Sequence, residues 1–140
     1  LVADPNPRRR VYHVPVVGYI AAGAPIEAIT DPNDAVELSD DFASQDAYAL
    51  RVRGKSMIED LIDDGDLVVI VPAQTANNGD TVVALITNGV SEHGEATLKR
   101  YYREQGHIRL QPANQTMQPI IVRPDEVQVQ GKVIALIRRI

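Results

Sequence analysis

The chain has 140 residues, 44% of them hydrophobic and only 4% aromatic, which suits one domain with a core of Val, Ile, Leu and Ala. Its net charge of −5 argues against a nucleic-acid-binding surface, because gripping a phosphate backbone needs clustered Lys and Arg. The lack of Cys excludes disulfides, thiolate metal sites and a cysteine nucleophile, and fits a cytoplasmic protein. No apolar run approaches the roughly 18 residues of a membrane span, and no signal peptide is visible.

The N-terminal residues, LVADPNPRRR, predict an extended linker, because two prolines and three arginines leave little to bury. We place this linker at residues 1–12 and one folded domain at residues 13–140. A solvated linker explains the Arg8-Arg9-Arg10 run, and a DNA-contacting arm is the alternative. Because the chain starts at Leu1 rather than Met, we expect a fragment whose missing part precedes it.

The next segments alternate between strand and loop signals. Residues 11–20 are strand-like, with Pro15 restricting such a strand to an edge or a bend. The small residues of 21–25 predict an extended loop, and the acidic stretch 30–46 predicts another. Tyr48, Leu50 and Val52 alternate with more polar residues, which indicates a strand with one buried face.

The remaining chain has the rhythm of an all-β domain. Residues 57–62 can form one or two helical turns. Strands are expected at 66–71, 80–87, 95–103, 107–112, 119–123 and 127–138, separated by turn signals. The sequence therefore predicts a mostly β fold, a compact domain of several short antiparallel strands with small helical turns.

No metal or cofactor site is expected. The three histidines have no ligand spacing: His13, His93 and His107. Four acids surround Gly65 like a calcium loop: Asp60, Asp63, Asp64 and Asp66. Ile62 and Val71 stand where such a loop needs oxygen ligands, so we interpret the segment as a solvated turn with Gly65 left-handed.

Ser56 lies at the corner between a strand-like run and the short helical stretch, and two readings are open. In the first, Ser56 and Glu59 form an S-x-x-E capping box. In the second, Ser56 is a nucleophile at a corner where backbone N–H groups can bind an oxyanion. A nucleophilic serine needs a base, and a lysine can serve when burial keeps it neutral.

Lys99 is the candidate base among three lysines. Lys55 adjoins the serine and is expected to point elsewhere, and Lys132 lies near the C-terminus. Lys99 stands in a strand-like stretch, where it shares a face with Thr97 and Tyr101. The alternative for Lys99 is an ordinary solvent-facing strand residue.

Three motifs, in order, resemble the self-cleaving C-terminal domain of LexA repressors, whose fold also serves UmuD and lambdoid phage repressors and is similar to signal peptidases. They are VGYIAAG at 17–23, GKSM at 54–57 and TLKR at 97–100. The run DGDLVVI after the serine and a G-x-x-[IV] strand at 131–134 extend the resemblance, which covers about residues 14–140.

The resemblance implies a Ser–Lys dyad that cuts its own chain. Ser56 would attack the carbonyl of Ala22, Lys99 would accept its proton, and the Ala22–Gly23 bond would break. Backbone N–H groups at Lys55 and Ser56 would form the oxyanion hole. In the family, RecA filaments on single-stranded DNA favour the cleavable state as part of the SOS response to DNA damage, which is a population shift.

The resemblance also implies a parent protein that represses transcription through an N-terminal DNA-binding domain, for which residues 1–13 are too short. One departure is a long hairpin tip at 87–94, which the hairpin can absorb so that Lys99 still reaches the cleft. Three alternatives remain: a UmuD-like self-processing polymerase accessory protein, a signal-peptidase relative, which would need a membrane anchor, and a non-catalytic β interaction domain.

The last strand, at 133–140, has two largely apolar faces. An exposed strand of this kind tends to pair with another edge, so we expect a homodimer. The alternative is burial of this strand inside one monomer's sheet.

Overall fold

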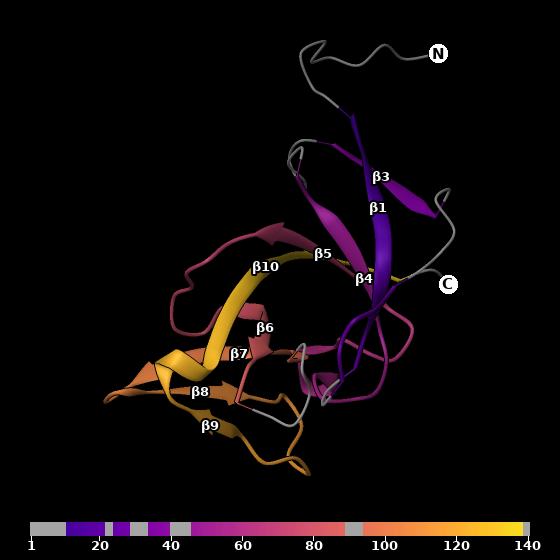
Figure 1. The fold of residues 1–140 in the computed structure, drawn as a ribbon. Helices are drawn as coiled ribbons and strands as arrows, with labels where there is room; N and C mark the ends of the chain where they lie inside the picture. The colour runs from indigo at the N-terminus through magenta and orange to yellow at the C-terminus, as the bar shows by residue number, and fades with distance from the viewer. Residues whose placement is uncertain (1–10, 22–23, 29–33, 40–45, 89–93, 139–140) are drawn as a thin grey trace, which may run out of the picture.

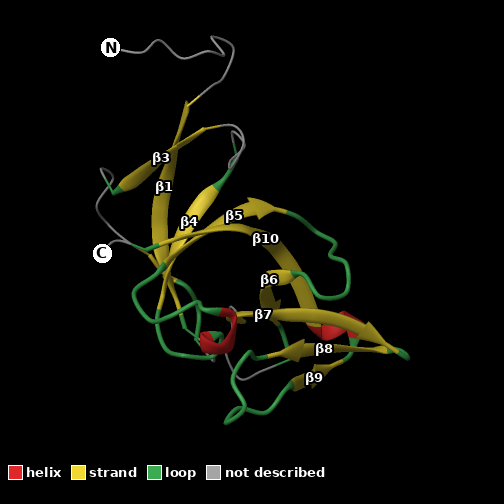
Figure 2. Ribbon diagram, turned by 180° about the vertical axis from the view of Figure 1, so that it is seen from behind, coloured by secondary structure: helices red, strands yellow, loops and turns green. Residues whose placement is uncertain are grey.

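The computed structural model describes residues 11–21, 24–28, 34–39, 46–88 and 94–138 (Figure 1). The strands are β1 (Val11–Ile20), β2 (Glu27–Ala28), β3 (Ala35–Ser39), β4 (Tyr48–Val52), β5 (Leu67–Pro72), β6 (Thr81–Ile86), β7 (Glu95–Glu104), β8 (His107–Gln111), β9 (Ile120–Val122) and β10 (Val127–Ile137). Two 3₁₀ turns are η1 (Ile58–Asp60) and η2 (Pro124–Glu126). Figure 2 shows how strands dominate the chain, which confirms the predicted mostly β fold.

The strands form one sheet in the order β2-β1-β4-β5-β10-β6-β7-β8-β9, with β3 also paired to β1. The pairings are antiparallel except between β1 and β4, which run parallel. In Figure 1, the long β10 arches between the group of β1, β3 and β4 and the group of β6 to β9. β5 and β10 therefore join the two halves of the domain.

The N-terminal half differs in two places from the structure that the sequence predicted. The expected loop at 30–46 contains β3, because Val36 and Leu38 pack on a buried cluster that includes Val14 and Val16. β4 was expected to bury one face, but Ala49 in that same cluster is fully buried on the other face. Local alternation could not predict either feature, because both depend on neighbours far away in the sequence.

β1 is a strand as predicted, and it starts at Val11, within the expected linker; residues 1–10 of that linker lie outside the described residues. It pairs with β3 as far as Pro15 and with β4 from Val16, where a register shift follows. Pro15 thus stands where the strand exchanges partners, which suits a residue that cannot donate a backbone hydrogen bond.

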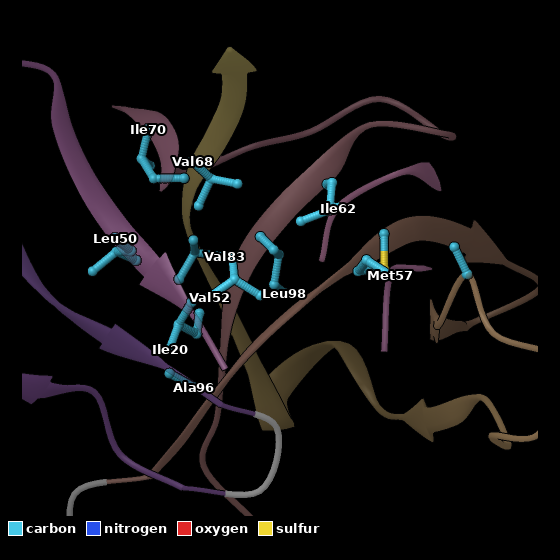
Figure 3. Close-up of a cluster of buried hydrophobic side chains, with 11 residues drawn as sticks. Ile20, Leu50, Val52, Met57, Ile62, Val68, Ile70, Val83, Ala96 and Leu98 are labelled. Carbon is cyan, nitrogen blue, oxygen red and sulfur yellow. The ribbon is translucent and has the colours of Figure 1, made fainter. Parts of the chain in front are cut away.

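The largest buried cluster joins segments that are distant in sequence (Figure 3). It contains Ile20 from β1, Met57 next to Ser56, and Ala96 and Leu98 from β7. This packing brings the serine turn, the end of β1 and the lysine strand to one place.

The last strand, β10, pairs with β6 over its first half and with β5 over its second half, and the two pairings overlap at Gly131 and Lys132. It pairs with β6 from Val127 to Lys132 and with β5 from Gly131 to Ile137. In the part of the chain that the structure describes, β5 alone pairs with β10 beyond Lys132. No helix among the described residues is long and apolar enough to cross a membrane.

Candidate active site

Lys99 is almost completely buried, with 1% of its surface exposed, so the solvent-facing reading is wrong. It lies on β7 opposite Val82 of β6, within a ladder that continues without a register shift to Ile86 and Glu95. The long hairpin tip therefore begins beyond the paired residues, although 89–93 themselves lie outside the described residues.

The Lys99 amine is held by two neutral oxygens. Its Nζ donates to the Thr97 hydroxyl at 2.7 Å and to the Leu98 carbonyl at 3.1 Å. Burial lowers the pKa of Lys99 to about 8, since desolvation disfavours the charged form. Two donated bonds match the two N–H groups of a neutral amine and leave its lone pair able to accept a proton.

Thr97 was predicted to share a strand face with Lys99 but was given no role, and the structure makes it a contact of the candidate base. It is 1% exposed and shares a face with Lys99, as the alternation predicted. A hydroxyl two residues before a strand lysine is the signal that could have identified it.

The predicted capping box at Ser56 is wrong. The N-cap of η1 is Met57, and no side chain caps this turn. Glu59 does not reach back, because its carboxylate accepts the Gln115 N–H at 2.7 Å and its own N–H donates to the Ala113 carbonyl at 2.7 Å. The loop after β8 thus supplies the partners that a cap would have provided.

The serine turn is fixed by contacts around it. The chain reverses at Gly54, whose φ of 89° favours glycine. The Gly54 N–H donates to an Asp64 carboxylate oxygen at 2.7 Å. Lys55 points away from Ser56, as predicted, and forms an ion pair with Asp63 at 2.7 Å that lowers the pKa of Asp63.

The four acids around Gly65 have separate partners, and Gly65 is left-handed, with a φ of 88°, as predicted. Asp63 and Asp64 hold the serine turn, Asp60 pairs with Arg100, and Asp66 pairs with Arg138. The segment therefore connects the serine turn to the rest of the sheet through ion pairs and hydrogen bonds.

Two contacts bring the serine turn to the lysine strand. Met57 and Leu98, the chain neighbours of Ser56 and Lys99, pack in one cluster (Figure 3). Arg100 donates from Nε to Asp60 at 2.7 Å. Among the hydrogen bonds of the described residues, none joins Ser56 to Lys99, so the dyad stays a prediction.

The predicted cleavage site, Ala22 and Gly23, lies outside the described residues, but both of its flanks are described. Before it, the Ile20 carbonyl accepts the Arg53 N–H at 3.0 Å, beside the strand that leads to Ser56. After it, the Ala24 carbonyl accepts the Ala96 N–H at 3.0 Å on the lysine strand. The two described flanks are therefore anchored to the two elements that carry the candidate dyad.

A family model described as Peptidase S24-like matches residues 15–134. The chain belongs to the Peptidase S24-like family. This S24 chain is 44% identical over 140 residues to a LexA repressor from Clostridium botulinum (strain Langeland), covering 99% of this chain and 66% of that protein. It is 46% identical over 132 residues to a LexA repressor from Caldicellulosiruptor saccharolyticus, and the match covers 94% of this chain and 61% of that protein. A LexA repressor from Ruminiclostridium cellulolyticum is 48% identical over 132 residues, and the match covers 94% of this chain and 58% of that protein.

These matches confirm the resemblance to the LexA-type peptidase domain. The S24 chain spans about two thirds or less of the length of these relatives.

Proposed function

We propose that this chain is the self-cleaving domain of a LexA-type repressor and that a Ser56–Lys99 dyad cuts the Ala22–Gly23 bond. The burial of Lys99 is the observation that supports this proposal most directly. A lysine in a core is costly, and no salt bridge among the described residues compensates its charge. A lowered pKa is what a lysine base requires, and it explains why a fold would keep this residue.

The proposed reaction begins when neutral Lys99 accepts the proton of the Ser56 hydroxyl as Oγ attacks the Ala22 carbonyl carbon. The backbone N–H groups of Lys55 and Ser56 stabilise the resulting oxyanion. Lys99 then returns the proton to the Gly23 nitrogen as the C–N bond breaks, which leaves an acyl-enzyme on Ser56. Water hydrolyses that ester, so the products end in an Ala22 carboxylate and begin with a Gly23 amine.

The anchored flanks of the cleavage segment support an intramolecular reaction. Ile20 and Ala24 are held beside the serine and lysine elements. The Ala22–Gly23 bond lies between these two residues in the sequence, so in the proposal it meets both elements at high effective concentration. In the proposal, a RecA filament on single-stranded DNA raises the population of this docked arrangement. The parent protein would act in the cytoplasm, binding operator DNA through a preceding domain as a homodimer.

Intact mass after incubation of the pure chain at pH 7 and about pH 10 tests the proposal. The expected fragments are residues 1–22 and 23–140, and they appear faster at the higher pH. Ser56→Ala and Lys99→Ala chains stay intact. Gly23→Asp also blocks cleavage, because a charged side chain would have to enter a dry cleft. A wild-type chain that remains intact, or that breaks at another bond, contradicts the proposal.

A further inference from the structure

Arg53 stands between β4 and the serine turn, three residues before Ser56. Its contacts reach both strands of the hairpin that carries the predicted cleavage site. Its guanidinium lies 3.8 Å above the centre of the Tyr19 ring on β1. Its Nη1 donates to the Glu27 carboxylate on β2 at 2.8 Å. One side chain therefore joins the segment before the bond, the segment after it and the approach to Ser56.

The two residues that Arg53 contacts face each other across the hairpin. Tyr19 pairs with Glu27, and Gly18 pairs with Ala28, which completes the described pairing between β1 and β2. Gly18 has no room for a side chain, because an added Cβ would lie 2.7 Å from the Glu27 carbonyl oxygen. Two residue pairs give a hairpin little stability of its own, so outside contacts decide where it rests.

We propose that Arg53 is a positioning residue that holds the cleavage hairpin against the serine turn and so sets the fraction of molecules ready to cleave. This inference rests on the proposed function. The ion pair is half exposed, with 48% of the Arg53 side chain and 65% of the Glu27 side chain accessible, so salt screens it. The contact with the Tyr19 ring adds to the attraction.

The test measures the cleavage rate of the full chain against pH, at low and high salt. Arg53→Gln keeps a polar side chain without charge and is expected to lower the rate roughly fivefold at low salt. The Arg53→Glu, Glu27→Arg double variant restores the ion pair and is expected to recover part of the loss. High salt is expected to slow the wild type and to leave Arg53→Gln unchanged.

Two controls separate positioning from general damage. Arg123→Gln removes an exposed ion pair with Asp125 elsewhere on the surface and should leave the rate unchanged. The midpoint of the pH–rate profile, which reports Lys99, should be the same in all variants. A midpoint that moves in Arg53→Gln overturns the inference, because the substitution would then disturb the base itself.

An Arg53→Gln chain that cleaves at the wild-type rate also overturns the inference, provided that Ser56→Ala is inert. The same holds for a charge-swapped double variant that is slower than either single one. A wild-type chain that never cleaves refutes the proposed function, so the two failures are distinguishable.

Discussion

Asn114 donates a hydrogen bond from Nδ2 to the Lys55 carbonyl oxygen at 2.9 Å, across 59 positions of sequence. Its Oδ1 accepts the Thr116 N–H at 2.9 Å, which fixes which end of the amide faces Lys55. The C=O and N–H of a trans peptide point in opposite directions. Holding the Lys55 carbonyl therefore directs the Ser56 N–H the other way, as the proposed oxyanion hole requires.

Replacing Asn114 by Ala is expected to lower the high-pH plateau of the cleavage rate by roughly tenfold, less than the 100-fold or more for losing an oxyanion donor outright. The midpoint of the pH–rate profile should not move. Gln115→Ala is the matched control, because its side chain is exposed and only its backbone N–H is used. An Asn114→Ala plateau equal to that of the wild type would show that this bond does not organise the site.

The cleavage rate should rise with pH and level off above about 8, because burial lowers the pKa of Lys99 to about 8 and its neutral amine is the proposed base. Single-turnover rates from pH 6 to about 10 measure this midpoint. A rate that is independent of pH, or a Lys99→Ala chain that cleaves normally, would exclude Lys99 as the base.

Lys99 should also make the folded domain more stable as pH rises from about 8 towards the usual lysine pKa of 10.5. In that window the unfolded chain binds more protons than the folded one, so deprotonation favours folding. Below about pH 8 the burial of the charged Lys99 amine lowers the free energy of unfolding by its full amount, roughly 3 kcal/mol. Denaturant unfolding should be measured for two chains that do not cleave, Ser56→Ala and the double variant Ser56→Ala, Lys99→Met. The free energy of unfolding should rise with pH in this window only in the single variant, which keeps Lys99.

Arg138 ties the end of β10 to the segment after the serine. It pairs with Asp66, which is 4% exposed, and donates to the Leu61 carbonyl at 2.7 Å. Its hydrogen bonds lower the pKa of Asp66, so this pair stabilises the fold above the usual aspartate pKa of 3.8 and the gain is lost as pH falls through the lowered value.

Arg138→Ala should lower the melting temperature at pH 7 by a few degrees, because it leaves a buried carboxylate without its partner. The difference from the wild type should shrink as pH falls below the usual aspartate pKa of 3.8 and vanish once pH has passed the lowered pKa of folded Asp66. Arg123→Ala removes ion pairs with Asp125 and Glu126 in which the arginine side chain is 73% exposed, and it serves as the control. Equal melting temperatures for Arg138→Ala and the wild type at pH 7 would contradict this account.

The homodimer remains a prediction, and its site can now be narrowed to the second half of β10. Ile134 and Leu136 are 44% and 39% exposed, on the stretch where β5 is the one described neighbour. Leu136→Lys should shift the chain towards monomer in light scattering at tens of micromolar, because it places a charge in an apolar interface. Ile121→Lys, at an exposed position on β9, should not. A wild-type chain that is already monomeric at this concentration would refute the dimer.

The sequence by itself determined most strands of the C-terminal half, the glycine turn at Gly65 and the candidate residues. Alternating apolar residues and turn signals are local, so β5 to β10 could be predicted to within about two residues. The choice of Ser56 and Lys99 also needed the resemblance of three ordered motifs to the LexA-type domain, because neither residue is distinctive alone.

Tertiary structure decided the features that depend on distant partners. Local pattern allowed Lys99 to face solvent and Ser56 to cap a turn, but packing buries the lysine and the loop after β8 takes over the partners of the turn. The parallel pairing of β1 with β4, the bond from Asn114 to Lys55 and the Arg53 contacts were equally hidden. A one-dimensional pattern specifies which residues prefer burial, but the free energy of a buried amine or an ion pair depends on neighbours that only the folded chain brings together.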